Sequence, residues 1–295
     1  MFEGLVTSML NKYLGDFIEN FRPEDINIGI MGGDVNLSNL TVKGSGLDFL
    51  RLPIKVKSGF IGSLQIKANW RSLSSQPVEV ILSDVFVVAE PRTSFHVDEK
   101  KDLESALSSK LFQLKAGEDM LLDVEATKES DNDDSYVART AAAVVDNIQL
   151  TLNNLHIRFE DALDTTPLSF GVCIEELSAR TTDMNWDYKF ITGQSIVYKL
   201  CALKNFFMYL NVGNKQAEPL NNVHDLRRVF VNTRGQGLQF LLAPVNASLK
   251  VRANKNELPG PRVTVSFDCA SIDFKLRETQ YNGLLGVASQ LGKIG

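Results

Sequence analysis

The chain contains three histidines, the side chains that would most readily serve acid–base catalysis or metal binding. His96, His156 and His224 lie far apart, and none has a second ligand at metal-binding spacing. The sequence lacks the His-Glu-x-x-His, Cys-x-x-Cys and Gly-x-Ser-x-Gly motifs. His156 falls on the polar side of an alternating segment, which predicts an exposed imidazole rather than a catalytic one.

The three cysteines are also far apart, at Cys173, Cys201 and Cys269. An odd number of cysteines within or beside apolar strand-like segments is typical of buried thiols in a reducing compartment. It does not indicate a disulfide framework or a zinc site.

The other polar clusters have simpler interpretations than catalysis. The glycines within 29–33 lack a following helix and Lys-Ser/Thr, so they predict a turn rather than a phosphate loop. The paired carboxylates at 133–134 and 160–161, and the arginines at 227–228, are typical of solvated surfaces. The sequence therefore predicts no enzyme, no cofactor and no metal site.

Composition agrees with a folded, non-secreted protein. The chain is 44% hydrophobic and 23% charged with a net charge of −5, which argues against a dedicated nucleic-acid-binding protein. Residues 98–134 hold 12 acidic and 5 basic side chains and predict a solvated insert. No apolar run is long enough for a transmembrane helix, and the N-terminus does not resemble a secretory signal, so we expect a cytoplasmic protein.

Residues 2–21 form the clearest predicted helix, with apolar side chains at helical spacing and Pro23 after its end. Its polar face is mostly acidic, so we favour packing against the protein over binding to a membrane surface. Further helices are predicted at 99–115, 135–147 and 278–292. Alternating segments predict strands at 26–32, 33–42, 54–67, 78–89, 148–160, 168–180, 196–210, 238–252 and 262–276; loops are predicted at 116–134, 181–195 and 211–237.

Seven of these strands share one apolar spacing, i, i+2, i+5 and i+7, the fourth copy with only a small alanine at its last position. The copies are Val35-Leu37-Leu40-Val42, Val80-Leu82-Val85-Val87, Leu150-Leu152-Leu155-Ile157, Val172-Ile174-Leu177-Ala179, Cys201-Leu203-Phe206-Met208, Phe240-Leu242-Val245-Ala247 and Phe267-Cys269-Ile272-Phe274.

The three-residue step in this spacing has a structural meaning. Side chains alternate between the faces of a strand, so a step of three would move the second half of each copy to the other face. An extra residue at the step, a β-bulge, would keep all four side chains on one face. A bulge or bend at mid-length in every strand, aligned across the sheet, predicts a long, bent antiparallel sheet, apolar on one face and solvated on the other: a trough. A two-layer sandwich, in which each strand changes sheet at the step, remains the alternative.

Several segments resemble the chorein N-terminal region of the vacuolar protein sorting thirteen family of bridge-like lipid-transfer proteins. These are Leu14-Gly15, GGDVNLSNLTV (32–42), LPIKVKSGFIGSLQI (52–66) with Trp70, QPVEVILSDVFVVAEP (76–91), LHIRFED (155–161), PLSFGVCIEELSART (167–181) and IDFKLRETQY (272–281). The sequence departs from the family at Ala68-Asn69 and in the insert at 98–134.

The resemblance implies a U-shaped sheet with an apolar floor, closed at one end by an N-terminal helix, which binds glycerophospholipids. It implies a peripheral position at endoplasmic reticulum–organelle contact sites, lipid transport between organelles, and a membrane-protein adaptor or scramblase as a possible partner at this end. It also implies that the chain is a fragment of a much longer one. We divide it into a cap at 1–97, the acidic helical insert at 98–147 and a continuation of the trough at 148–295, forming one structural unit.

The larger apolar repeat positions are the predicted lipid-binding residues. They are Val35, Leu37, Leu40, Val80, Leu82, Val85, Leu150, Leu152, Leu155, Ile157, Val172, Ile174, Leu177, Leu203, Phe206, Met208, Phe240, Leu242, Val245, Phe267, Ile272 and Phe274. The alternative function is a protein-interaction module whose apolar face docks a partner or another copy. Because protein interfaces favour Tyr, Trp and Arg whereas these positions are aliphatic or Phe, the composition favours lipid.

Overall fold

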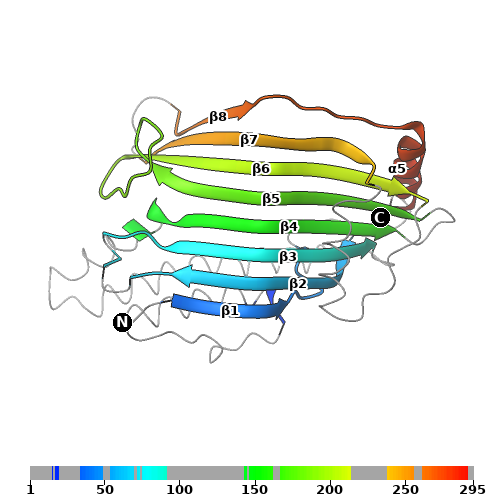
Figure 1. Ribbon diagram of the computed structural model, residues 1–295, viewed down its shortest axis with the longest axis horizontal. Coiled ribbons are helices and arrows are strands. Elements are labelled where there is room, and N and C mark those ends of the chain that lie inside the picture. The colour runs from blue at the N-terminus through cyan, green and yellow to red at the C-terminus, as the bar shows by residue number, and fades with distance from the viewer. Residues whose placement is uncertain are drawn as a thin grey trace, which may run out of the picture.

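The computed structural model describes residues 15, 17–19, 34–48, 54–69, 72–73, 75–91, 143–144, 146–161, 167–213, 238–255 and 261–291. Within them, eight strands lie side by side in one sheet in the order of the sequence, and helix α5 follows the last strand (Figure 1). The elements are β1 (Asp34–Thr41), β2 (Ile54–Lys67), β3 (Glu79–Pro91), β4 (Gln149–Asp161), β5 (Leu168–Thr182), β6 (Ile196–Val212), β7 (Phe240–Asn254), β8 (Val263–Cys269) and α5 (Glu278–Leu291).

The single sheet decides between the two predicted architectures. Neighbouring strands pair along most of their length, on both sides of each predicted step. No strand of the described part changes sheet, so the sandwich alternative is wrong there. Strands from before and after residues 98–147 belong to this one sheet, while the division of the chain into three segments stays a prediction.

One pairing corrects the predicted antiparallel sheet. β3 and β4 are parallel, with Val80 opposite Leu150 and Val87 opposite Ile157, whereas the other six pairs are antiparallel. Parallel neighbours need a long crossover connection, and residues 92–148 supply the length for one. The repeat could not reveal this direction because the spacing i, i+2, i+5, i+7 reads the same in both directions.

The C-terminal end agrees with the sequence in its helix and differs in its last strand. The segment predicted as a strand to residue 276 leaves the ladder after Cys269, and Phe274 forms an isolated bridge with Leu242. The helix predicted at 278–292 is α5. Its fully buried Gln280 donates from Nε2 to the backbone oxygens of Leu210 (2.9 Å) and Gln239 (3.2 Å), which fixes α5 at the end of the sheet.

Two other predicted helices are described only in small parts. Gly15 and Phe17 of the predicted N-terminal helix are helical, and the buried Ile18 forms a bridge with Val42. Residues 143–144 and 146–147, at the end of the third predicted helix, are also helical. The remaining predictions for 1–33, 92–142 and 214–237 lie outside the described residues, as do His96 and His224. No helix in the described part has the length and apolar character needed to cross a membrane.

Apolar side chains of β1, β2 and β3 pack into two clusters of buried residues. Val35 and Leu37 pack with Leu64 and Ile66 of β2, and Val144 contacts this cluster. A second cluster joins Val42, Val56, Ile61 and Val87. Burial of these side chains stabilises the first strands because each contributes about 1.5–3 kcal/mol when removed from water.

Candidate functional site

The apolar repeat positions of different strands lie directly opposite one another. Leu37 pairs with Leu64, Leu64 with Leu82, Leu82 with Leu152, Leu152 with Leu177, and Leu177 with Leu203. Residues directly opposite each other on neighbouring strands project to the same face of a sheet. The apolar repeat is thus arranged in rows that cross the sheet on one face, which we call the apolar face.

The three other rows have the same character. They contain Val35, Ile66, Val80, Leu150, Ala179, Cys201, Leu249 and Phe267; Leu40, Ile61, Val85, Leu155, Ile174, Phe206 and Val245; and Val87, Ile157, Val172, Met208 and Leu242.

In four strands, β1, β3, β4 and β6, a left-handed residue at the step keeps the repeat on one face. Asn39, Asp84, Asn154 and Asn205 have φ values of 56°, 58°, 56° and 46°. Asn and Asp tolerate this backbone region better than other non-glycine residues. One such residue interrupts the alternation, so the side chains before and after the step return to the same face.

This geometry corrects the predicted bulge. From β1 to β5 both partners leave the ladder together at the step and rejoin it in unchanged register, as in Ser38 opposite Ser63 and Leu40 opposite Ile61. No extra residue is therefore inserted there. A register shift at the step occurs between β6 and β7, at Leu203/Phe206. The predicted alignment of the steps across the sheet is confirmed, and in β1, β3, β4 and β6 the step contains a left-handed residue.

Polar side chains at the step connect neighbouring strands. Asn154 Nδ2 donates to Asp84 Oδ1 at 2.9 Å, between the parallel strands β3 and β4. The backbone N–H of Asn205 donates to Asn246 Oδ1 at 2.8 Å, between β6 and β7. The Asn205 side chain also donates to Glu175 of β5. We call this line of Asn, Asp and Glu side chains the polar seam.

Exposure of the apolar face changes across the sheet. Val35 in β1 is fully buried and Leu37 is 5% exposed, whereas Phe267 in β8 is 58% exposed. The repeat leucines of β4, β5 and β6 are partly exposed, including Leu152, Leu177 and Leu203. Apolar repeat positions are thus partly open to solvent over the central strands, and Phe267 in β8 is more exposed still.

The predicted lipid-binding residues within the ladder belong to these rows, with one exception. Phe240 lies opposite Tyr209, and its ring contacts Phe207 edge to face with centroids 5.5 Å apart. These partners lie between repeat positions and therefore project from the other face, so Phe240 is placed there. Ile272 follows the end of β8 outside the ladder and is exposed. Contact of the other residues with lipid stays a prediction.

Sequence reasoning missed part of the apolar face. Gly59, Ile61, Leu64 and Ile66 of β2 follow the repeat spacing with glycine at its first position, and Leu249 of β7 extends its row. The spacing in β2 was a usable signal, because it matches the other copies. Leu249 is identified only by the register between β6 and β7.

One part of the opposite face, at the end of β4, corrects the prediction of a solvated surface. His156, Arg158 and Glu160 of β4 are buried, and His156 Nε2 lies 2.9 Å from the hydroxyl oxygen of Tyr209. Arg158 forms an ion pair with Glu160 at 2.9 Å. Burial raises the pKa of Tyr209, so this hydroxyl keeps its proton. The imidazole is therefore neither exposed nor placed in an open catalytic cleft.

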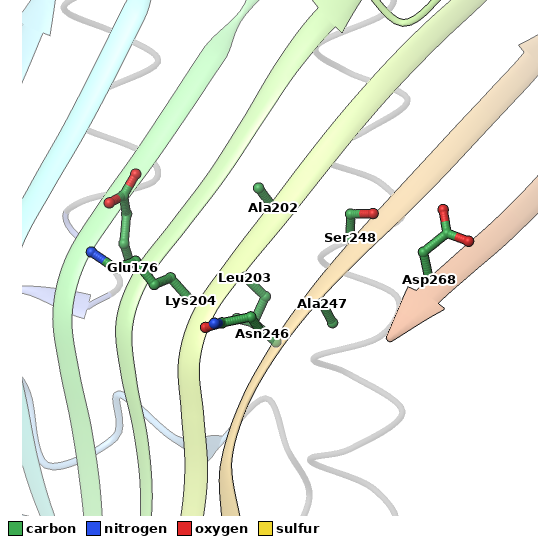
Figure 2. Close-up of a pocket in the computed structure, with 8 residues that line it drawn as sticks. All are labelled: Glu176, Ala202, Leu203, Lys204, Asn246, Ala247, Ser248 and Asp268. Carbon is green, nitrogen blue, oxygen red and sulfur yellow. The ribbon is translucent and has the colours of Figure 1, made fainter. Parts of the chain in front are cut away.

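A shallow depression lies on this opposite face beside the polar seam. It has a volume of about 530 Å³ and is lined by Glu176, Ala202, Leu203, Lys204, Asn246, Ala247, Ser248 and Asp268 (Figure 2). Lys204 forms an ion pair with Glu175 at 2.9 Å, and the hydrogen bond to Glu175 raises the pKa of Lys204. Across the described ranges, no group of three or more His, Cys, Asp or Glu residues is placed to hold a metal ion.

Comparison with known proteins identifies the family of the chain. A model of the VPS13-like family N-terminal region matches residues 1–294. The chain is 31% identical to the intermembrane lipid transfer protein VPS13A of Mus musculus over 97% of its own length and 9% of the mouse protein. It is 29% identical to the intermembrane lipid transfer protein VPS13 of Chaetomium thermophilum, over 97% of this chain and 10% of that protein.

A more distant relative shows the same coverage. The intermembrane lipid transfer protein VPS13D of Homo sapiens is 25% identical over 99% of this chain and 7% of its own length. The chain thus spans about a tenth or less of these curated relatives. Because the family model covers nearly every residue, the chain belongs to the VPS13-like family and corresponds to the part described as its N-terminal region.

Proposed function

We propose that this chain binds glycerophospholipids on its apolar face and contributes to their transfer between organelle membranes, without enzymatic chemistry. The observation that supports the proposal is the register of the repeat, which places Leu152, Leu177 and Leu203 side by side and partly exposed. The names of the relatives, intermembrane lipid transfer proteins, agree with this interpretation.

The chemistry of the apolar face favours acyl chains over a protein partner. Apart from Cys201 and Met208, the rows contain aliphatic and Phe side chains, and they contain no Tyr, Trp or Arg, the residues that supply most binding energy at protein interfaces. They offer no charged or hydrogen-bonding side chain to a headgroup. Recognition would therefore depend on the acyl chains, and binding should discriminate little between headgroups.

The free energy of such binding depends on the apolar surface of the lipid that the rows bury. Each buried methylene group contributes about 0.8 kcal/mol, so five methylene groups in contact with the rows would supply about 4 kcal/mol. Neighbouring strands are about 4.8 Å apart, and an acyl chain lying along the rows crosses several of them. Because the same residue types recur from strand to strand, a lipid can shift along the rows without losing contacts.

The proposal includes the trough and its setting. The sheet bends at the polar seam so that the apolar face lines a trough, residues 2–21 close one end, and headgroups remain on the open, wet side. We propose a peripheral position on the endoplasmic reticulum side of membrane contact sites, with a membrane-protein adaptor or scramblase at the N-terminal end. The family assignment supports these parts of the proposal.

The test is to purify the chain from cells and identify the co-purified lipid by organic extraction and mass spectrometry. We expect glycerophospholipids of mixed headgroup at more than trace molar ratio. The triple variant Leu152→Asp, Leu177→Asp and Leu203→Asp should lose them, because it places three carboxylates in one row.

The matched control adds the same charge to the same strands on the other face. Thr151 is opposite Ser178, and Ser178 is opposite Ala202, so Thr151→Asp, Ser178→Asp and Ala202→Asp form the neighbouring row. The control should retain lipid, with both variants checked for folding by circular dichroism. Equal lipid loss in the two variants would contradict the proposed face. Lipid-free wild-type protein that forms a dimer would support docking of another copy instead.

A further inference from the structure

The connection between β5 and β6 is an ordered loop with exposed apolar side chains. Met184 is 71% exposed and Tyr188 is 54% exposed, although both belong to a loop with internal hydrogen bonds. Asp183 Oδ1 accepts from the backbone N–H of Asn185 at 2.8 Å and of Asp187 at 3.2 Å. Tyr188 also forms a bridge with Thr182. The apolar side chains are thus presented by a defined backbone.

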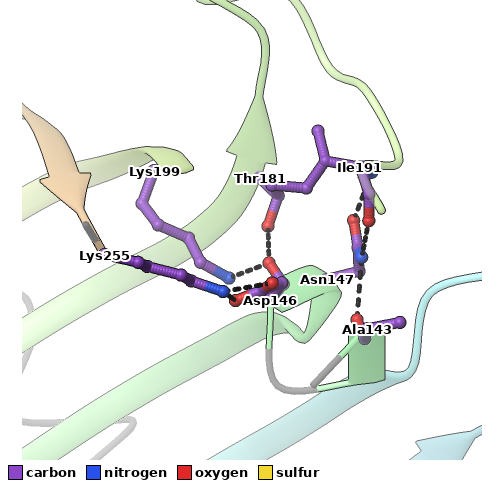
Figure 3. Close-up of polar contacts among 7 residues, drawn as sticks. All are labelled: Ala143, Asp146, Asn147, Thr181, Ile191, Lys199 and Lys255. Atoms are coloured by element: carbon purple, nitrogen blue, oxygen red, sulfur yellow. Dashed lines mark hydrogen bonds and ion pairs between the residues drawn. The ribbon is translucent and has the colours of Figure 1, made fainter. Parts of the chain in front are cut away.

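A buried amide holds the far side of this loop. The side chain of Asn147, 1% exposed, donates to the backbone oxygens of Ala143 (2.7 Å) and Ile191 (2.6 Å) (Figure 3). It also accepts from the backbone N–H of Ile191 at 2.8 Å. Thr181 Oγ1 donates to the Asp146 carbonyl at 2.6 Å at the base of the loop. Because these groups are paired and buried, the loop is preorganised, which reduces the ordering cost of binding a partner.

The loop folds over the strands on the face opposite the apolar rows. The ring of Trp186 contacts Tyr198 edge to face with centroids 5.5 Å apart, and Lys250 Nζ lies 5.7 Å from its centre. Tyr198 is opposite Thr182 on one side and Arg252 on the other. Leu200, two residues along, is opposite Arg180 and Lys250. Aromatic and cationic side chains from the loop and from β5, β6 and β7 therefore form one surface.

We call this surface the loop patch, defined by Arg180, Met184, Trp186, Tyr188, Tyr198 and Arg252. Neither arginine forms an ion pair with a described residue. The nearby Lys250 forms an ion pair with Asp268 of β8 at 3.4 Å, and neither of these two residues belongs to the loop patch. Tyr, Trp, Met and Arg are the residue types enriched in protein interfaces. Composition therefore separates the two faces of the sheet.

We propose that the loop patch is a docking site for an acidic peptide segment of a partner protein, with an apolar anchor residue beside Asp or Glu. The anchor would pack between Met184 and the rings of Trp186 and Tyr188. The acidic residues would pair with Arg180 and Arg252, whose planar guanidinium groups suit carboxylates. This proposal does not depend on lipid binding, because the patch lies on the other face.

An anionic membrane surface fits the loop patch less well. Asp183 and Asp187 flank Met184 and Trp186 in the loop, so two carboxylates lie beside the side chains that would meet anionic headgroups. Trp186 lies over Tyr198 and Lys250 instead of projecting from the tip. A peptide can place its carboxylates over the arginines and avoid the loop carboxylates, whereas a uniform anionic surface cannot.

The test is selection of a phage-displayed random peptide library against the chain, followed by fluorescence anisotropy with the selected peptides. We expect enriched sequences with Leu, Phe or Trp beside Asp or Glu. The double variant Arg180→Glu and Arg252→Glu should weaken binding at least tenfold. A peptide with its acidic residues changed to Lys should bind this variant better than it binds the wild type, a gain that misfolding cannot produce. Lys204→Glu, an exposed charge reversal outside the loop patch, is the matched control.

Three results would overturn the proposal. One is a selection that yields no acidic consensus, and another is an affinity that falls equally in Lys204→Glu. The third is a wild-type chain that binds phosphatidylcholine–phosphatidylserine vesicles through Arg180 and Arg252 while selecting no peptide, which would assign the patch to a membrane instead.

Discussion

Substitution of Asn154 by Gly and by Ala tests whether a left-handed residue keeps the repeat on one face. Asn154 lies in the central strand β4 with φ at 56°, and its Nδ2 donates to Asp84 Oδ1 at 2.9 Å. Both substitutions remove that hydrogen bond, whose net contribution is about 1 kcal/mol. They differ in the backbone, because a Cβ disfavours the left-handed region and glycine has none.

The expected magnitudes follow from these two effects. Asn154→Ala should lower the free energy of unfolding by about 2–3 kcal/mol, the sum of the lost hydrogen bond and about 1–2 kcal/mol of left-handed strain. Asn154→Gly should lower it by about 1 kcal/mol less than Ala does, since glycine relieves the strain but loses more conformational entropy on folding. Glycine is thus expected to be the more stable of the two variants.

Urea unfolding followed by circular dichroism measures both variants, with Thr151 of the same strand as the control. Thr151 is in the regular part of the ladder opposite Ser178, so there glycine should be less stable than alanine by about 0.5–1 kcal/mol. The prediction is therefore that Gly is more stable than Ala at position 154 and less stable than Ala at position 151. If Gly were less stable than Ala at Asn154 as well, the left-handed backbone conformation of Asn154 would be contradicted.

Three further predictions concern buried contacts on the sheet. Gly171→Ala would place a Cβ 2.0 Å from Cε1 of the buried Tyr209, so it should cost about 1–3 kcal/mol in urea unfolding and much less in a Tyr209→Ala background. Burial raises the pKa of Tyr209 above its usual 10.0, so the unfolded chain loses this proton first as pH rises. The free energy of unfolding should then fall above pH 10 by about 1.4 kcal/mol per pH unit. Tyr209→Phe should remove that contribution, and an unchanged dependence on pH in this variant would contradict the buried hydroxyl. Asn147→Ala should lower the free energy of unfolding by about 2 kcal/mol, because it leaves the N–H and carbonyl of Ile191 unpaired. It should also speed hydrogen exchange of the Ile191 amide; unchanged protection there would contradict the role given to the Asn147 side chain.

The sequence was sufficient for features that depend on local periodicity. Alternation predicted the described strands within a few residues, except for the C-terminal end of β8, and the repeated spacing predicted that Leu152, Leu177 and Leu203 share a face. These predictions hold because side-chain direction along a strand depends on the backbone of that strand alone. The helix at 278–292 was predicted for the same reason, from helical spacing within one segment.

The candidate site was predicted in its residue types more fully than in its geometry. Asn39, Asp84, Asn154 and Asn205 marked the step, but the spacing could not distinguish an inserted residue from a left-handed one, since both restore the face. Phe240 was assigned to the apolar face because its spacing fits the repeat. The register between β6 and β7, where three shifts occur, places it on the other face.

Only the tertiary structure decided the direction of β4 and the burial of part of the second face. A palindromic spacing carries no information on direction, so the parallel pairing of β3 with β4 depends on the path of the connecting chain. His156 and Arg158 have the polar pattern of a solvated face, yet both are buried: Tyr209 of β6 supplies a partner for His156, and Glu160 of the same strand pairs with Arg158. A sequence pattern shows which side chains share a face, whereas contacts between distant segments decide whether that face meets water.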